Sequence, residues 1–415
     1  MRGTFNFGTS TVVISRSAVI RGEGRENDIP LTKVYKKGWA FPFWRLPDGI
    51  ENRDHVFVVD GENIDVTIEN IHFMDFNYTC LDGHRGNSMT IKNNRITLET
   101  GLGRGRSMPP WGDFIIGISQ YSDFPSGVLI EGNYLDFALL RRREGIVYPE
   151  RARDPEWRPD LVNHEYYVGL GIYITHASGK VNIVNNVVRN VSGEAITAND
   201  NKASAEIKIK NNTIVCKIGG SYWFDKRWAG FGIFARASWV HPHSGYRVEI
   251  SNNTIEYDKP NSCGIGIRGP EYAPEDTGKL CEGIVKNNHI HLQDGSIGIL
   301  LESCDGFDIT DNTMSGKAYY GIGVFPETDI QRSNLGANEN VINNNYMRDL
   351  NIKNPDDYSK VLFDEKAYAG SKEGSTTAHV WLSTNTKGNV VKVSSGETVI
   401  DEGENNTIIC KEIDA

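Results

Sequence analysis

Four ionisable residues in the middle of the chain lie at or just after the ends of short apolar runs that recur along the sequence. They are His176, Asp200, Arg236 and Arg268, and GLGIYIT and GFGIFAR are two of the runs. Aligned positions in stacked strands lie about 5 Å apart, so a stack would bring these side chains together. Removing a proton next to a carboxylate needs a base and a cation, and the four residues offer both. We predict them as catalytic residues; the alternative is a polar row that only faces solvent.

Further residues along this row, and aromatic residues beside it, are predicted to bind substrate. The polar members are Asn199, Glu302 and Glu327. Aromatic side chains suit the apolar faces of sugar rings, and the aromatic members are Trp223, Trp228, Trp239 and Tyr173. The alternative role for each aromatic residue is packing within a loop. Spacing alone identifies no metal-ligand set.

The apolar runs also predict a groove. Alternation with period two places one set of residues inward: Ile172, Ile196, Ile233, Ile267, Ile299 and Val324. It places small residues outward: Gly171, Ala195, Gly232, Gly266, Gly298 and Gly323. Outward glycine and alanine would form a flat floor, with long loops entering before the strands and leaving after them. The alternative is that these glycines only allow a loop to pack closely.

A second motif recurs along most of the chain, with an apolar anchor, one variable residue and an Asn corner, as in NIVNNVV and KIKNNTI. The anchors are Ile68, Ile91, Ile130, Ile183, Ile209, Ile250, Val285, Ile309 and Ile342. The shortest spacings are 23, 24 and 26 residues, which gives a base period near 24 with insertions. Such a unit cannot bury its apolar face alone, so stacked units must share one core.

The Asn corners and short β-branched strands resemble the right-handed parallel β-helix proteins of the pectate-lyase-like superfamily. The resemblance implies an all-β fold, a single-stranded right-handed parallel β-helix (a solenoid) with long loop insertions. We expect one β-helix domain over residues 1–415. The inserted loops are predicted at about 25–54, 97–113, 136–168, 217–229, 237–246, 269–280, 326–338 and 351–376.

Composition limits the partners. The chain has 415 residues, a formal net charge of −10 and no apolar run of 18 residues. We therefore expect neither nucleic acid nor a membrane span. The segment after Met1 reads as strand rather than as a signal peptide, and self-association or a cap is expected at the N-terminal edge. The six cysteines are expected mainly in the core, with a Cys263–Cys281 disulfide as the alternative.

The resemblance implies an extracellular or cell-surface protein that acts on an acidic or neutral polysaccharide, as a lyase or an epimerase. In such enzymes an Arg, Lys or His is the base, and acidic residues often bind Ca²⁺. By this analogy Arg236 or His176 is the base and Arg268 neutralises the substrate, while Asp200 and Glu302 hold Ca²⁺ as the cofactor.

Two alternatives stay open. A glycoside hydrolase would use paired carboxylates, for which Asp200, Glu302 and Glu327 are candidates. A carbohydrate-binding or structural surface β-helix would need no catalytic group. The pectate lyase signatures are absent, and Asp82-Gly83-His84 is only a short fragment of the polygalacturonase pattern.

Overall fold

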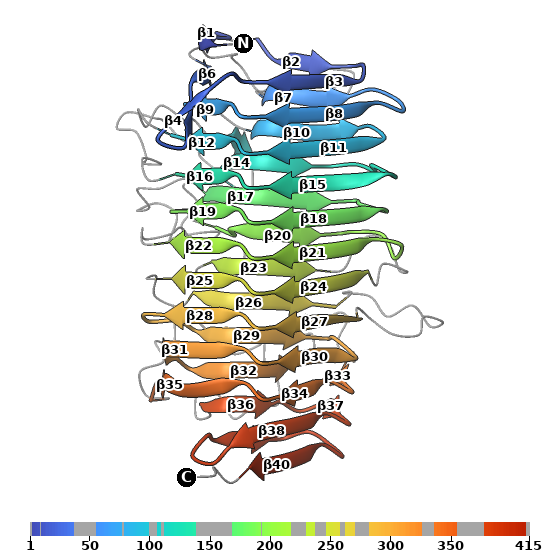
Figure 1. Ribbon diagram of the computed structural model, residues 1–415. Coiled ribbons are helices and arrows are strands. Elements are labelled where there is room, and N and C mark those ends of the chain that lie inside the picture. The colour runs from blue at the N-terminus through green and yellow to red at the C-terminus, as the bar shows by residue number, and fades with distance from the viewer. Residues whose placement is uncertain are drawn as a thin grey trace. The chain divides into compact units, whose positions relative to one another are not determined.

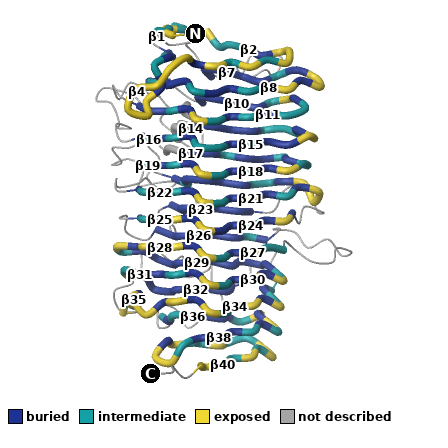
Figure 2. The backbone as a smooth tube through the Cα atoms, viewed as in Figure 1, coloured by how far each residue is buried: buried dark blue, intermediate teal, exposed yellow. Residues whose placement is uncertain are grey.

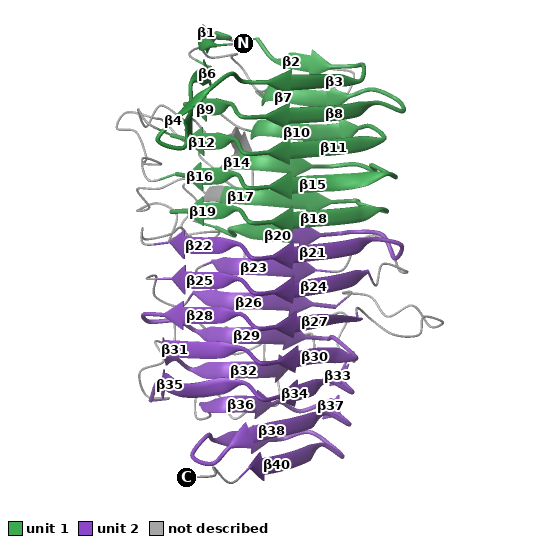
Figure 3. Ribbon diagram, viewed as in Figure 1, with its two compact units in different colours: residues 1–197, 220–224 green, residues 198–219, 225–415 purple. Residues whose placement is uncertain are grey.

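The computed structural model divides into two compact units, each described separately below (Figure 3). Unit 1 comprises residues 1–197 and 220–224, and unit 2 comprises residues 198–219 and 225–415. The division falls within β20 (Ile196–Asn199). The structure describes residues 2–8, 10–36, 55–76, 79–98, 106–108, 112–137, 168–191, 193–216, 230–236, 246–257, 262–269, 282–325, 336–354 and 377–411.

Unit 1 contains three parallel sheets, here called its first, second and third sheets. The first contains β1 (Gly3–Asn6), β6 (Thr32–Tyr35), β9 (His72–Met74), β12 (Arg95–Thr97), β16 (Tyr134–Asp136) and β19 (Val187–Arg189). The second contains β2 (Val12–Ile14), β7 (His55–Asp60), β10 (Thr79–Arg85), β14 (Gly112–Gln120) and β17 (Val168–Thr175). The third contains β3 (Ala18–Arg21), β8 (Asp65–Glu69), β11 (Ser88–Lys92), β15 (Gly127–Glu131) and β18 (Lys180–Val184). Antiparallel pairs join β4 (Arg25–Glu26) to β5 (Ile29–Pro30), and β13 (Arg106–Met108) to β14.

Unit 2 has the same three sheets. The first contains β22 (Thr213–Cys216), β25 (Thr254–Tyr257), β28 (His289–Leu292), β31 (Thr313–Ala318) and β35 (Tyr346–Ile352). The second contains β23 (Phe231–Arg236), β26 (Cys263–Arg268), β29 (Ile297–Glu302), β32 (Tyr320–Phe325), β36 (Ala378–Leu382) and β39 (Val399–Asp401). The third contains β21 (Glu206–Lys210), β24 (Arg247–Ser251), β27 (Glu282–Lys286), β30 (Phe307–Thr310), β34 (Val341–Asn343), β38 (Val390–Ser394) and β40 (Thr407–Lys411). A short parallel pair joins β33 (Ala337–Asn338) to β37 (Thr386–Lys387).

Successive strands of the main coils enter the second, third and first sheets in turn, and each pairs in parallel with its counterpart one coil away (Figure 1). The all-β parallel β-helix predicted from the repeat is therefore confirmed. Some of the predicted loops contain strands: β4, β5 and β6 lie within 25–54, and β13 lies within 97–113. No helix among the described residues is long and apolar enough to cross a membrane.

The core is built from the repeat anchors. All nine anchors are buried, and in unit 1 the third-sheet register aligns Ile68, Ile91, Ile130 and Ile183. Buried positions alternate with exposed or half-buried ones along the third-sheet strands, while exposed residues concentrate at the turns (Figure 2). Cys263 is a buried thiol in the structure, and Cys281, its partner in the alternative disulfide, lies outside the described residues. Four cysteines are buried, as expected: Cys80, Cys216, Cys263 and Cys304.

The two residues of each Asn-Asn corner have different roles. The first has a left-handed backbone, as at Asn93 (φ 55°) and Asn185 (φ 57°), a conformation that asparagine tolerates better than most residues. The second is buried and hydrogen-bonds to its counterpart in the next coil. In unit 1, the Asn94 backbone N–H donates to Asn133 Oδ1 (3.0 Å), and Asn133 Nδ2 donates to Asn186 Oδ1 (3.0 Å).

Buried asparagines of unit 2 form the same kind of hydrogen-bonded ladder from coil to coil. The amides of Asn253, Asn288, Asn312 and Asn345 form one chain, with side-chain bonds of 2.9 to 3.0 Å. Each amide also donates to a carbonyl of a preceding coil, as Asn288 Nδ2 does to Ile250 O (3.0 Å). A buried corner thereby has its polar groups paired inside the protein.

The predicted glycine floor is not one column. Gly232 and Gly298 face the core, because a Cβ on them would lie 2.6 Å from Ile255 Cγ2 and 2.6 Å from Met314 Sδ, respectively. Gly266 faces outward but aligns with Phe234 and Leu300. The outer face carries a buried apolar cluster: Phe231, Phe234, Cys263, Ile297, Leu300, Tyr319, Tyr320, Phe325 and Trp381.

The six residues predicted to point inward are all buried. In the register, however, Ile233 aligns with Ile299, whereas Ile267 aligns with Leu301 and Val324, two positions farther along. Aligning the strands by their glycines in the sequence therefore placed residues from two different register positions in one column.

Replacing Asn133 by Ala should destabilise unit 1. Its amide oxygen accepts from Asn94, and its nitrogen donates to Ile91 O and Asn186 Oδ1, so the change leaves buried polar groups without partners. We expect a loss of roughly 2–4 kcal/mol in the free energy of unfolding, measured by urea denaturation. Asn185→Gly, at the exposed neighbouring corner position, should cost less than about 1 kcal/mol. Equal losses in both variants would contradict the stabilising role of the hydrogen bonds that join Asn94, Asn133 and Asn186 from coil to coil.

Stability should fall with acid because of His72 in β9. Burial, then the charges of Arg95 and Lys33, lower the pKa of His72 from 6.5 to about 4, and its Nε2 lies 2.8 Å from Thr97 Oγ1. Between pH 6.5 and 4 the unfolded chain gains a proton that the folded chain excludes. Stability is therefore complete above pH 6.5 and is lost as the pH falls towards 4, by roughly 3 kcal/mol.

His72→Gln should remove most of this pH dependence in unfolding experiments at pH 7 and pH 4.5. His289→Gln, which changes an exposed histidine of β28, is the control and should leave the dependence unchanged. Identical pH profiles for the wild type and His72→Gln would refute the assignment.

Candidate functional site

The outer face of the second sheet in unit 1 gathers a compact polar centre. Asp82 of β10 is aligned with Val58 of β7 and Ser119 of β14. His55 begins β7, and His84 follows Asp82 on β10. We call Asp82, His55, His84 and Ser119 the Asp82 centre.

Both imidazoles of the Asp82 centre meet one carboxylate oxygen. His84 Nε2 lies 2.7 Å and His55 Nδ1 3.2 Å from Asp82 Oδ2. Ser119 Oγ donates to the other oxygen, Asp82 Oδ1, at 2.6 Å. The side chains of Asp82 and His55 are buried, whereas that of His84 is 32% exposed. The centre is therefore reached from solvent through His84.

The carboxylate stays ionised despite its burial. Burial alone would raise the pKa of Asp82. The hydrogen bond from His84, the charges of His55 and His84 and the hydrogen bond from Ser119 outweigh burial and hold this pKa below its ordinary value. The centre thus keeps a negative charge between nitrogen donors.

A buried lysine fixes the start of β7 behind the centre. Lys36 Nζ donates to the His55 carbonyl oxygen at 2.7 Å and to Thr11 Oγ1 at 3.2 Å. Only 2% of Lys36 is exposed. These contacts hold the backbone of His55, and they therefore set where its imidazole can reach.

Aromatic rings extend from the centre across β14 and β17. The ring centroids of His84 and Tyr121 are 6.3 Å apart, and those of Tyr121 and Tyr173 are 5.5 Å apart. Both tyrosines are partly exposed and pack against the buried pair Ile116 and Leu170. An apolar ring face with a polar edge is a suitable platform for a sugar.

Three of these side chains could hold a metal ion. One donor atom from each of His55, Asp82 and His84 lies within 4.8 Å of the other two, and this is the one such group among the described residues. Two imidazole nitrogens and one carboxylate oxygen suit Zn²⁺ and related first-row ions, whereas Ca²⁺ prefers oxygen ligands. The Ser119 hydroxyl would fix the second carboxylate oxygen, as outer hydrogen bonds do in metal sites.

Ca²⁺, which the family resemblance implied, does not fit the residues proposed for it. Glu302 Oε2 lies 2.7 Å from Arg268 Nε, so its carboxylate is joined to a cation. Neither Asp200 nor Glu302 belongs to a group of three donor side chains within the described chain. We therefore derive no step that uses Ca²⁺.

Part of the predicted catalytic row is aligned in unit 2. Arg236, Arg268 and Glu302 occupy one register on β23, β26 and β29. Asp200, just after Asn199 at the end of β20, has φ 51° and donates its backbone N–H to Arg236 O (3.2 Å). The row there contains a buried ion pair rather than an open carboxylate.

The other predicted residues lie elsewhere. In unit 1, Tyr173 belongs to the ring series of the Asp82 centre. His176 follows β17 with φ 59°, and its Nδ1 lies 3.0 Å from Thr175 Oγ1. His176 and Asp200 belong to different units. Four predicted residues lie outside the described residues: Glu327, Trp223, Trp228 and Trp239.

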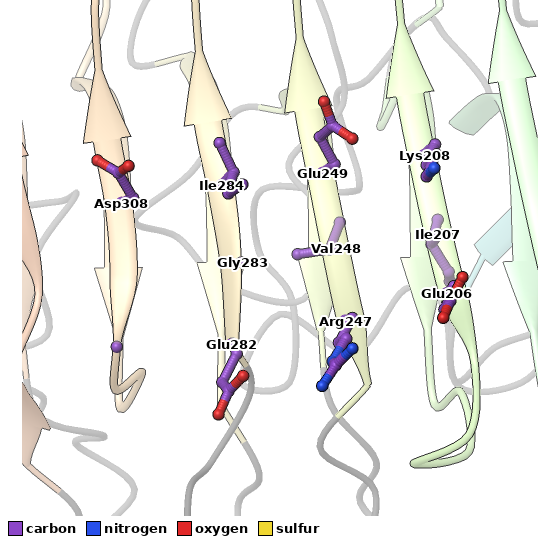
Figure 4. A pocket seen from close by; sticks show the side chains of 11 residues that line it. Glu206, Ile207, Lys208, Arg247, Val248, Glu249, Glu282, Gly283, Ile284 and Asp308 are labelled. Atoms are coloured by element: carbon purple, nitrogen blue, oxygen red, sulfur yellow. The ribbon is translucent and has the colours of Figure 1, made fainter.

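Unit 2 also has a shallow pocket of about 460 Å³ on the outer face of its third sheet. Charges of opposite sign alternate across its strands, with Glu206, Arg247 and Glu282 in one register (Figure 4). Glu249 is joined to Lys210 at 2.7 Å. The pocket contains no predicted site residue, and its alternating charges are typical of a solvated surface.

The sequence contained a sign of the Asp82 centre, in Asp82-Gly83-His84. His55 was missed because it begins its strand, three positions before the residue that aligns with Asp82. A comparison of strand ends cannot connect these positions. Only the packing of side chains on one face brings the second imidazole to the carboxylate.

No protein-family model and no curated protein matches the chain. Among solved structures it is similar to DFA-IIIase from Arthrobacter chlorophenolicus A6 in complex with DFA-III, with 10% identity and a TM-score of 0.41 over 96% of this chain and 86% of that one. It is also similar to the periplasmic alginate epimerase AlgG. A point mutant of AlgG gives 14% identity and a TM-score of 0.31, and a second AlgG structure gives 13% and 0.25; both cover 86% of this chain and 77% of the other. None of these likenesses assigns an activity or a residue role here.

Asp82→Ala should destabilise unit 1 because it leaves the Ser119 hydroxyl and the His84 imidazole without their acceptor and removes the carboxylate beside His55. We expect a loss of roughly 2–4 kcal/mol in the free energy of unfolding. The matched control is Asp60→Ala, whose carboxylate is 42% exposed and pairs with Arg85; it should cost less than about 1 kcal/mol. Urea denaturation compares the two, and equal losses would show that the centre does not act as a buried network.

Proposed function

We propose that the chain is a carbohydrate-active β-helix protein of the pectate-lyase-like kind that acts on a uronic acid polymer, as a lyase or an epimerase. The Asp82 centre is its reaction site and holds a divalent first-row metal ion. The observation that carries the proposal is the meeting of two imidazoles and a carboxylate beside partly exposed tyrosines.

The protein's own residues have separate tasks in this proposal. Tyr121 and Tyr173 bind the apolar face of a sugar ring. His55, Asp82 and His84 would hold the metal ion, and three protein ligands would leave room for a substrate group. A metal ion held there would supply positive charge that neutralises the carboxylate of a bound uronate.

Ser119 and Lys36 position these ligands. Ser119 holds the carboxylate oxygen that does not face the imidazoles, and Lys36 holds the backbone of His55. A site prearranged in this way binds its ion without having to order the ligands first. Burial of Asp82 and His55 also keeps water from the inner side of the site.

The hydrolase alternative has less support. Hydrolysis by paired carboxylates needs two acids about 5–9.5 Å apart. Within the described residues, the ion pairs of Asp82 are both with histidines. The row of Arg236, Arg268 and Glu302 remains a proposed ligand-contact strip of unit 2, with Asp200 and Asn199 at its start and His176 as a proposed contact in unit 1.

Turnover should depend on metal. Chelator-treated protein should lose at least about 100-fold of its activity on a panel of uronan polymers, and Zn²⁺ or Mn²⁺ should restore it. Ultraviolet absorbance of unsaturated sugars detects a lyase, and proton NMR of the uronate isomers detects an epimerase. His84→Gln should lower kcat by about 100-fold, whereas His291→Gln, at an exposed position of β28, should not.

Tyr173→Ala should raise KM about tenfold because the sugar loses its platform, and Tyr173→Phe should restore most of the affinity. Full turnover in the chelator would refute the metal-dependent mechanism. Reducing ends released without unsaturated product or changed isomer content would show hydrolysis. Binding to a glycan array without any turnover would establish the non-catalytic alternative.

A further inference from the structure

A second cluster of unit 1 lies on the outer face of its first sheet, away from the strands of the Asp82 centre. One register aligns Lys33, His72, Arg95 and Tyr134 across β6, β9, β12 and β16. Two residues farther along these strands, a second register aligns Thr97, Asp136 and Arg189. We call Lys33, Arg95, Tyr134 and Arg189 the arginine face.

Among the residues that the structure describes, no acid forms an ion pair with the two arginines of this face. Arg95 Cζ lies 4.2 Å from the centroid of the Tyr134 ring, a stacked cation–π arrangement. The Nε atoms of Arg95 and Arg189 are buried and have no hydrogen-bond partner in the described part of the chain. Within the described residues, neither guanidinium forms an ion pair. A buried N–H group without an acceptor is costly. Both side chains are half-buried overall, so an arriving oxyanion would reach the terminal guanidinium nitrogens rather than Nε.

The carboxylate of Asp136, which is aligned with Arg189, has other partners. Asp136 Oδ2 accepts from the Tyr134 hydroxyl at 3.0 Å, and Asp136 Oδ1 accepts from Asn190 Nδ2 at 2.9 Å. The face therefore combines three cationic side chains with one carboxylate that is already hydrogen-bonded. Counted over the described residues alone, the face carries more positive than negative charge.

The positive charges of the face act on the pKa values of neighbouring side chains. After burial, the charges of Arg95 and Lys33 are what lower the pKa of His72. Burial and Asp136 raise the pKa of Tyr134, while Arg189 and Arg95 act to lower it.

We propose that the arginine face is a binding site for the carboxylate of a uronic acid residue in an acidic glycan. Guanidinium groups bind carboxylates through paired N–H donors, and a sulfate ester would offer similar oxygens. The choice of a sugar as carrier rests on the proposed function, and the tyrosine beside the arginines fits it. The face would hold polymer at a distance from the reaction site and so raise affinity without taking part in the chemistry.

The test uses metal-free full-length protein and isothermal titration with four probes: oligogalacturonate, sulfated dextran, dextran and inorganic phosphate. Oligogalacturonate should bind best, and its affinity should fall as salt is added. The double variant Arg95→Gln/Arg189→Gln should bind it at least tenfold more weakly, and Arg95→Lys should lose less. The control is Arg85→Gln, because Arg85 is exposed and already paired with Asp60 and Glu62; it should bind like the wild type.

Asp82→Asn separates this inference from the proposed function. It should leave oligogalacturonate binding unchanged even if it abolishes turnover, because the arginine face does not include the Asp82 centre. Unchanged affinity in the double arginine variant would overturn the site, provided that thermal unfolding shows the variant to be folded. Preference for sulfated dextran, or equal binding of inorganic phosphate, would overturn the uronate assignment.

Discussion

The need to pair buried polar groups at each corner governs this fold. A coil that turns sharply into the core exposes backbone and side-chain polar groups there, and the asparagine ladder satisfies them from the neighbouring coil. Asn133 alone joins Asn94, Ile91 and Asn186. Because each amide needs its counterpart in the next coil, the ladder fixes how neighbouring coils align, and that alignment decides which outer residues become neighbours.

The Asp82 centre follows from this alignment. Asp82 and Ser119 are direct neighbours across two strands, so their hydrogen bond requires no long reach. His55 arrives from the start of its strand and meets the same carboxylate as His84. Lys36, just after β6, holds the backbone of His55. A short repeat thus creates a site from β7, β10 and β14, although no single strand carries more than two of its members.

The two proposed sites of unit 1 differ in the charge that they present. The Asp82 centre offers a carboxylate between imidazoles and suits a cation, whereas the arginine face offers guanidinium groups and suits an anion. The Asp82 centre has two tyrosine rings beside its charged groups, and the arginine face has one. Outer positions of a β-helix are free to differ because the core constrains only the inward residues, so one scaffold can carry both chemistries on separate sheets.

The sequence by itself determined the coil. Its anchors, from Ile68 to Ile342, predicted stacked units that share one core, because that packing recurs with the repeat. It also predicted the alignment of Arg236 with Arg268. Only the tertiary structure decided which way Gly232 and Gly298 face, that Glu302 pairs with Arg268, and that His55 reaches Asp82. These outcomes depend on strand register and side-chain direction. The second-sheet strands are rich in glycine and lack a strict alternation of polar and apolar residues, so their sequence does not determine either property.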